Sequence, residues 1–298
     1  MSRIIIGIHG MGNKPHSQQL QRWWKAAILE GLKGRRQSRL LKFQLVYWAS
    51  ILHDTPLNLY TLKEPYVKGT PLKGSGEISE RQEWLRDHLN EQLDKIFLEE
   101  DGSLNFSHLT DFIIRHFVQD LDAYYNKLSY GNSKESPREL ICRQLSETLH
   151  KNRRKKILLI AHSMGSIITW DVLTKYNPHV KIDTLVTIGS PLGLPVVRSK
   201  MFSHANVNDR DRNENPLLKT PENIIKNWYN LSDFKDRVAI NYDLNNDFLP
   251  NSHMVQPEDI LVRNNYEYKN DENHHKSYGY LRCPEMAVIV KEFLRWRL

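Results

Sequence analysis

Two cysteines and the lack of any long apolar run set the first limits on this 298-residue sequence. Cys142 and Cys283 are too few for a disulfide framework, so we expect each to be a small buried side chain in a reducing compartment. The apolar run within residues 1–10 is too short for a signal peptide, and no other stretch is long enough to span a membrane. These absences favour a cytoplasmic protein.

The sequence also lacks the signatures of nucleic-acid-binding proteins, although it is basic, with a formal net charge of +7. No RNP, zinc-finger or helix-turn-helix motif is present, so we expect no nucleic-acid partner. The basic residues gather in two clusters, 33–42 and 151–156, each at the junction of an expected helix and an expected strand. Cations at such a junction complement the negative carboxyl end of the helix and stay solvated. The alternative is that the clusters make peripheral contact with an anionic membrane.

Motifs for metals and dinucleotide cofactors are missing as well. Residues 209–215, DRDRNEN, alternate acidic and amide side chains as a calcium loop does, but the loop's sixth-position glycine and twelfth-position glutamate are absent. The early glycine-rich loop does not fit G-x-G-x-x-G, because Pro15 stands where the third glycine would be needed. We therefore expect no required metal and no cofactor.

What the sequence does contain is a regular alternation of apolar runs and amphipathic segments. The runs that predict strands are 3–8, 42–49, 155–160, 183–189, 224–231 and 259–268. The segments with helical periodicity are 17–32, 138–150, 165–176 and 284–297. This alternation predicts an α/β fold, in which a mainly parallel sheet is covered by helices on both faces.

One turn in this pattern carries chemistry. The stretch LLIAHSMGSIIT, residues 158–169, places a small polar cluster between a predicted buried strand and the start of a predicted helix. Such a turn lifts its central side chain, Ser163, out of the core. Ala161-His162-Ser163-Met164-Gly165 fits G-x-S-x-G with alanine in the first position, and small residues are needed there because the backbone doubles back sharply. A serine that merely caps the helix is the alternative.

This turn resembles the nucleophile elbow of the α/β-hydrolase superfamily, and in particular of its lipase and esterase branch. Some bacterial lipases carry the same Ala-His-Ser-Met-Gly sequence. The resemblance covers residues 1–50, 137–197 and 223–298. It implies an α/β-hydrolase fold, a triad in the chain order serine, acid, histidine, an oxyanion hole, and an active site at the carboxyl edge of the sheet.

The resemblance extends to the loop after the first predicted strand. His9-Gly10-Met11-Gly12 is similar to the family's H-G-x-G loop. An oxyanion hole needs two backbone N–H groups aimed at the developing alkoxide. The amide of Met11 would supply one, and the amide of Met164, which follows the nucleophile, would supply the other. A plain glycine turn between strand and helix is the alternative.

The resemblance places the base in the loop before the final helix, which reads NHHKSYGYL at 273–281. His275 fits the His-x-Ser-Tyr pattern of lipase-like members, and His274 is its near rival. His253 reads as a loop residue, and His162 as a residue that packs or forms a hydrogen bond away from the nucleophile.

The acid is expected in the loop that follows the predicted strand 224–231, where two aspartates are available. Asp236 fits the family's Asp-x-Val pattern. Asp233 lies nearer the strand end and reads as a turn residue that binds local backbone amides. Of the two, we predict Asp236 as the acid.

Residues 51–134 interrupt the α/β pattern, so the predicted core consists of 1–50 and 135–298. The interruption opens with proline and glycine and then carries two apolar stripes at helical spacing, through 85–97 and 113–128. Connections longer than about 15 residues are usually functional or disordered, and the stripes argue for order. We expect a helical cap over or beside the catalytic edge, with a peripheral decoration as the alternative.

We expect a metal-independent serine hydrolase in which Ser163, Asp236 and His275 form the triad. It would act on a small-molecule or lipid-like carboxylic ester through an acyl-enzyme. Fold and triad do not fix the substrate. Thioesterase, lipid deacylase and amidase activity therefore stay open, as does a non-catalytic protein that uses the hydrolase fold for binding.

Overall fold

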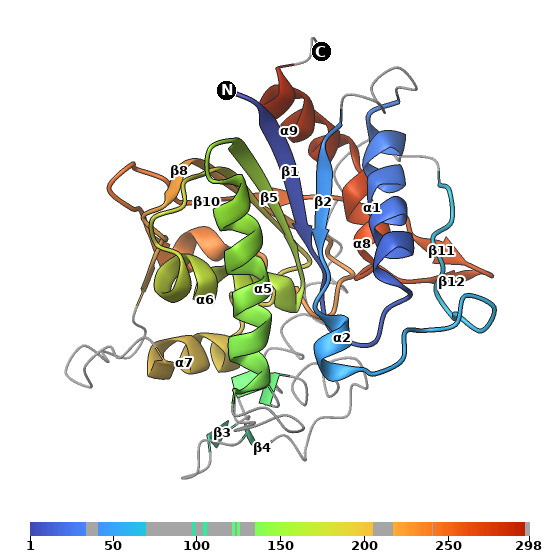
Figure 1. Ribbon diagram of the computed structural model, residues 1–298, viewed down its shortest axis with the longest axis horizontal. Helices are drawn as coiled ribbons and strands as arrows, with labels where there is room; N and C mark the ends of the chain where they lie inside the picture. The colour runs from blue at the N-terminus through green and yellow to red at the C-terminus, as the bar shows by residue number, and fades with distance from the viewer. Residues whose placement is uncertain are drawn as a thin grey trace.

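A six-stranded parallel sheet forms the centre of the computed structural model, which describes residues 1–33, 41–69, 97–98, 104–105, 121–122, 124–125, 135–204, 217–239 and 241–295. The strand order is β10–β8–β6–β5–β1–β2, and every neighbouring pair is parallel (Figure 1). The strands are β1 (Arg3–Ile8), β2 (Phe43–Val46), β5 (Lys156–His162), β6 (Ile182–Ile188), β8 (Ile224–Ser232) and β10 (Pro257–Leu261). The sheet confirms the expected fold class.

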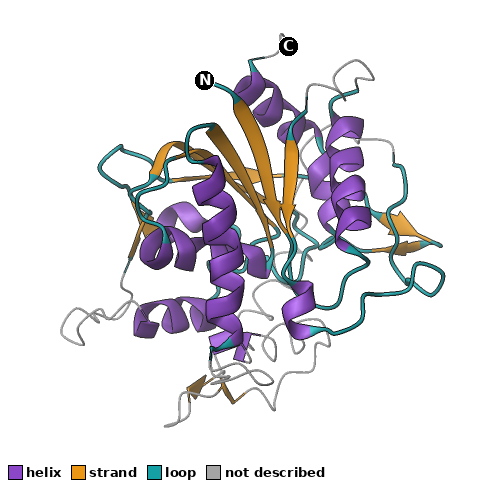
Figure 2. Cartoon of the chain, viewed as in Figure 1, coloured by secondary structure: helices purple, strands orange, loops and turns teal. Residues whose placement is uncertain are grey.

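Helices pack on both faces of this sheet, because successive side chains of a strand point to opposite sides. Ile4, Ile6 and Ile8 of β1 belong to the core on one face, whereas Ile5 belongs to the core on the other. The first face carries α2 (Ala49–Leu52), α5 (Pro137–Asn152), α6 (Met164–Asp171) and α7 (Pro195–His204). The second carries α1 (Ser17–Gly31), α8 (Ser277–Arg282) and α9 (Pro284–Leu294), as Figures 1 and 2 show.

Shorter elements complete the description. A π-helical turn at Val172–Tyr176 extends α6, and a 3-10 turn spans Leu244–Asp247. Three pairs of two-residue strands are present: β3 (Phe97–Leu98) with β4 (Leu104–Asn105), β7 (Leu218–Lys219) with β9 (Phe248–Leu249), and β11 (Glu267–Tyr268) with β12 (Asp271–Glu272).

Two strands are shorter than the apolar runs that predicted them. The run 42–49 forms a strand only to Val46, because the backbone N–H of Trp48 donates to the His9 imidazole at 3.1 Å and α2 follows directly. The run 259–268 pairs in the sheet only to Leu261. Beyond it, the backbone N–H of Asn264 donates to the Asp233 carboxylate and draws the chain away from the sheet.

Helices α2, α7 and α8 were not expected. α7 lies outside the segments with predicted helical periodicity, and its Val196, Val197 and Met201 are buried in the core. The predicted histidine loop, 273–281, is irregular only up to Lys276, and α8 begins at Ser277. The remaining helices agree closely with the periodicity, because their apolar stripes are long enough to set both ends.

Several sequence predictions fall on the part of the chain that is not described. These are most of the two stripes 85–97 and 113–128, the calcium-like stretch 209–215, and most of the basic cluster 33–42. Among the described residues, Cys142 and Cys283 are both free and buried. None of the described helices combines the length and the apolar character needed to cross a bilayer.

Candidate active site

The turn at Ser163 is a sharp junction between β5 and α6. Ser163 has φ 53° and ψ −129°, a backbone conformation that is strained for a residue with a side chain. A Cβ on Gly165 would lie 2.8 Å from the carbonyl oxygen of Ile8, so only glycine fits where α6 passes β1. Local packing therefore explains the small residue that the G-x-S-x-G pattern requires.

The side chain of Ser163 leaves the core as expected, but it does not stand exposed: only 2% of the residue is accessible. The loop after β1 covers it, since a Cβ on Gly10 would be 2.7 Å from the Cβ of Ser163. The loop that carries His275 covers it from another direction. Ser163 thus lies at the bottom of a site formed by three loops.

Three predicted residues meet here in a chain of hydrogen bonds. The Ser163 hydroxyl lies 2.9 Å from Nε2 of His275, and Nδ1 of His275 lies 2.9 Å from each carboxylate oxygen of Asp236. Nδ1–H of a neutral His275 donates to the carboxylate, so Nε2 is left to accept the serine proton. The imidazole is thereby oriented to remove a proton from Ser163.

Asp236 is buried, and its carboxylate is well supplied with donors. Tyr280 donates from its hydroxyl at 2.7 Å, and the backbone N–H groups of Val238 and Ala239 donate at 2.9 and 3.2 Å. Burial alone would raise the pKa of Asp236, but His275 and these hydrogen bonds outweigh it and hold the pKa below its usual value. The carboxylate is therefore ionised, as a partner of a histidine cation must be.

Gly189, directly after β6, makes room for this carboxylate. A Cβ there would lie 2.9 Å from Oδ2 of Asp236 and 3.2 Å from Nδ1 of His275, and the backbone has φ 53°. Both conditions require glycine. The sequence shows a glycine at the end of an apolar run. The role of this glycine could not be predicted, because it depends on contacts with residues far along the chain.

The rival residues form a separate pair. Oδ1 of Asp233 accepts the backbone N–H of Lys235 at 2.7 Å, and Oδ2 accepts that of Asn264, so Asp233 holds the loop backbone together. Nδ1 of His274 lies 3.7 Å from Oδ2 of Asp233, and its Nε2 is 3.0 Å from Glu272. The contacts of Ser163 are with His275, not with this pair.

The loop after β1 is fixed by a contact between His9 and Trp48. Nδ1–H of His9 donates to the carbonyl of Gly10 at 2.7 Å, and Nε2 accepts the backbone N–H of Trp48. The indole N–H of Trp48 donates to the carbonyl of His9 at 2.9 Å, and the two rings stack at 4.8 Å. Burial, with a contribution from Lys14, lowers the pKa of His9 to about 3, so this imidazole stays neutral. The Met11 backbone, whose carbonyl accepts from the Lys14 ammonium, follows directly.

His162 has a definite contact rather than a packing role alone. Its Nε2–H donates to the backbone carbonyl of His275 at 2.8 Å, and the two rings lie 4.9 Å apart. Burial lowers the pKa of His162 well below its usual value, and His275 lowers it further. A neutral His162 therefore positions the backbone of His275. The sequence had offered a hydrogen-bonding role as one of two interpretations, without a partner.

A strap at 61–69 braces the same loop from outside. The carboxylate of Glu64 accepts from the Asn273 amide at 2.6 Å and from the Lys276 ammonium at 2.7 Å. Asn273 in turn accepts the backbone N–H of His275 at 2.9 Å. Glu64 was not predicted from the sequence, because more than 200 residues separate it from its partners and no local motif marks it.

An apolar cavity lies next to the predicted oxyanion amides. Its lining comes from the loop after β1, from α2 and its preceding turn, from α5, from the start of α6 and from the inserted segment: Met11, Trp48, Leu52, Tyr124, Pro137, Ile141 and Met164. Tyr124 is fixed there by its hydroxyl, which donates to the buried Asp171 at 2.9 Å. Asp171 also pairs with Arg138 at 2.8 Å. At least one described residue of the insertion 51–134 thus reaches the site.

The described part of the chain holds no group of three or more His, Cys, Asp or Glu side chains arranged to bind a metal ion.

Two comparisons with known proteins fit this arrangement. A family model described as a PGAP1-like alpha/beta domain matches residues 110–228, a range that contains Ser163 and ends before Asp236 and His275. A probable mitochondrial phospholipase of Saccharomyces cerevisiae is 32% identical over 92 residues, which make up 26% of this chain and only 12% of the yeast protein. Together with the parallel sheet, these similarities support the assignment of the chain to the α/β-hydrolase superfamily.

Proposed function

We propose that this protein is a serine hydrolase that cleaves a carboxylic ester, with Ser163 as nucleophile, His275 as base and Asp236 as the acid of the triad. The observation that carries the proposal is the continuous set of 2.9 Å contacts from Ser163 through His275 to Asp236. These residues come from three separate loops at the carboxyl edge of the sheet. Such a constellation is recognised by its geometry and its roles.

In the proposed reaction, Oγ of Ser163 attacks the ester carbonyl carbon while Nε2 of His275 takes the hydroxyl proton. The backbone amides of Met11 and Met164 stabilise the tetrahedral oxyanion. His275 then gives its proton to the alkoxide oxygen as the carbon–oxygen bond breaks, so the alcohol leaves. Water attacks the acyl-enzyme with His275 again as base, and the carboxylic acid is released.

We further propose that the acyl group is lipid-like. The small apolar cavity formed by Met11, Met164 and their neighbours lies beside the proposed oxyanion amides, and its apolar lining suits an alkyl chain better than a polar group. The similarity to a protein named as a probable phospholipase supports the same substrate class. An apolar lining without a charged side chain favours an acyl chain over a polar substituent at this position.

The test is labelling with a fluorophosphonate probe, combined with hydrolysis of nitrophenyl esters of increasing acyl length. We expect the wild type to be labelled and to prefer medium or long chains, and Ser163→Ala to lose both labelling and turnover. Ser50→Ala, an exposed serine on α2, is the matched control and should behave as the wild type. A wild-type protein that is neither labelled nor active on any chain length would contradict the proposal.

A further inference from the structure

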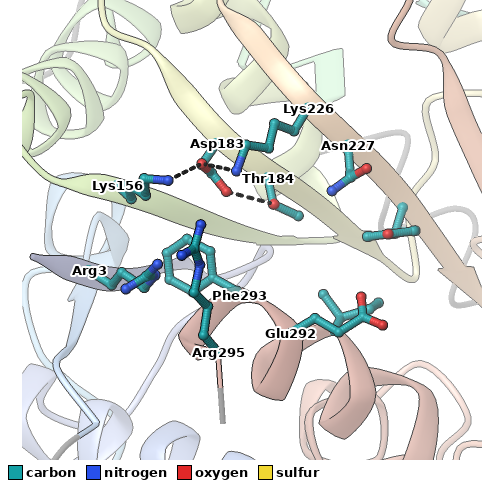
Figure 3. Close-up of a pocket in the computed structure, with 11 residues that line it drawn as sticks. Arg3, Lys156, Asp183, Thr184, Lys226, Asn227, Glu292, Phe293 and Arg295 are labelled. Carbon is teal, nitrogen blue, oxygen red and sulfur yellow. Dashed lines mark hydrogen bonds and ion pairs between the residues drawn. The ribbon is translucent and has the colours of Figure 1, made fainter. Parts of the chain in front are cut away.

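A second cavity, which is polar, lies at the amino edge of the sheet, opposite the edge that carries Ser163. It is lined by the first residues of several strands and by the end of α9. Arg3 and Lys156 begin β1 and β5 and are register partners, Lys226 lies near the start of β8, and Arg295 caps α9. Figure 3 shows these four side chains around one space.

Positive charge dominates this cavity. Its lining contains four cationic side chains but only two carboxylates, Asp183 and Glu292, a net charge of +2. Asp183 is buried and lies 2.9 Å from the Lys226 ammonium and 3.9 Å from that of Lys156. The charge of Lys226 lowers the pKa of Lys156, and the charge of Asp183 raises it. The charges of Arg295 and Arg3 lower the pKa of Lys156 further. The cations therefore repel one another across a shared space.

Arg3 and Arg295 carry the positive charge of the lining that no carboxylate pairs with. Within the ranges that the structure describes, neither guanidinium group has an ion-pair or hydrogen-bond partner. Arg295 occupies a left-handed conformation, φ 57° and ψ 39°, that ends α9 beside Arg3 (Figure 3). Cations at a helix carboxyl end are favourable on their own account. That effect explains Arg295, but it does not explain three further cations brought from three different strands.

We propose that this cavity binds a phosphate group, either as inorganic phosphate or as a phosphomonoester. Such a group carries a charge of about −1.5 to −2 near neutral pH, which matches the net +2 of the lining. The planar guanidinium groups of Arg3 and Arg295 suit its oxygens, because each can donate two parallel hydrogen bonds. The Asn227 amide, which also lines the cavity, can add a further donor, whereas the Thr184 hydroxyl donates to Asp183 at 3.5 Å.

The site is separate from the proposed hydrolase site and does not depend on that assignment. Of its basic residues, only Lys156 belongs to a cluster that the sequence marks, 151–156. The others come together through the parallel register of β1, β5 and β8 and through the return of α9 to the same edge. A sequence pattern could not have shown this grouping.

The experiment is calorimetric titration of the full chain with inorganic phosphate at constant ionic strength. We expect saturable binding to the wild type and an affinity lower by about tenfold or more in the double variant Arg3→Gln/Arg295→Gln. Arg22→Gln, an exposed arginine on α1, is the matched control and should bind as the wild type. Because neither guanidinium group has a partner among the described residues, the double variant should fold normally, which circular dichroism checks.

A second arm distinguishes the two sources of the phosphate group. Sedimentation with phosphatidylcholine vesicles, with and without phosphatidate, tests a lipid-borne phosphomonoester. Binding to free phosphate alone supports a soluble ligand, and additional phosphatidate-dependent binding that the double variant loses supports a lipid ligand. Absence of binding in both arms, or equal binding by the double variant and the wild type, overturns the proposal. Ester hydrolysis, measured in parallel, is expected to be the same in wild type and double variant.

Discussion

The hydroxyl of Tyr280 donates a 2.7 Å hydrogen bond to Oδ2 of Asp236. The same phenol oxygen accepts the backbone N–H of Asp233 at 3.0 Å. One buried side chain on α8 therefore supplies a donor to the proposed triad acid and fixes the backbone at the other aspartate of the loop. Burial and the neighbouring Asp236 and Asp233 raise the pKa of Tyr280 well above its usual value, so it remains a donor.

Tyr280→Phe should lower kcat/KM for a nitrophenyl ester by about tenfold, because the Asp236 carboxylate loses a donor and the Asp233 amide loses its acceptor. The ring itself is kept, so packing changes little. Tyr278→Phe, on the same helix, is the control, since no hydrogen bond of its hydroxyl is found within the described ranges and its rate should stay near that of the wild type. A Tyr280→Phe rate within twofold of the wild type would count against this role.

Asp233 and Asp236 can be separated by single substitutions. We expect Asp236→Asn to lower kcat by roughly four orders of magnitude, because an amide no longer holds the His275 tautomer or stabilises its cation. Asp233→Asn should leave kcat within about tenfold of the wild type but lower the melting temperature. The wild-type carboxylate accepts hydrogen bonds from two backbone N–H groups, and the N–H₂ group of the new amide cannot accept them. If the large rate loss belonged to Asp233→Asn instead, the assignment of the triad acid would be wrong.

The sequence predicted those parts of the molecule that are determined locally. Apolar runs identified the six core strands, and the turn around Ser163 could be placed because strand, small residues and helix follow one another within twelve residues. Asp236 and His275 required the family resemblance, since spacing alone left Asp233 and His274 as alternatives. The structure puts these rivals together elsewhere, at 3.7 Å from each other.

The features that escaped prediction depend on contacts between distant segments. The end of β10 is set by Asn264 donating to Asp233, and nothing in the run 259–268 itself marks that point. The strap residue Glu64 lies 212 positions before Lys276. Such long-range polar contacts are specified by the fold as a whole, so no window of sequence contains both partners.

Glu64→Gln tests the strap as a positioning element for the His275 loop. The neutral amide keeps the shape of Glu64 but loses the charge pairing with Lys276, so we expect a fall of roughly three- to tenfold in kcat/KM with KM little changed. Glu267→Gln, an exposed glutamate on β11, is the matched control and should not change the rate. An unchanged rate in Glu64→Gln would limit the strap to a structural role.

The same variant gives a pH test with a defined sign. Burial alone would raise the pKa of Glu64, but the Lys276 charge and the hydrogen bonds from Lys276 and Asn273 outweigh it and lower the pKa. A lowered folded pKa stabilises the protein above the usual glutamate value of about 4.3, and this stabilisation is lost as pH falls through the folded value. The difference in melting temperature between wild type and Glu64→Gln should therefore be constant near neutral pH and shrink below about pH 4. A difference that grows as the pH falls would contradict this.

The last prediction concerns the apolar cavity that we propose for the acyl chain. Ile141 is fully buried on α5 and lines this cavity together with Met11 and Met164. Ile141→Phe adds volume there, so we expect kcat/KM for long-chain nitrophenyl esters to fall by about tenfold while that for the acetate ester changes little. Overpacking of the core costs about 1–3 kcal/mol, so a somewhat lower melting temperature is expected as well. Leu140→Phe, the neighbouring residue on the same helix but outside the cavity, is the control and should leave the chain-length profile unchanged. If Ile141→Phe lowered the rates for all chain lengths equally, the cavity would not be the acyl site, although the nucleophile assignment would stand.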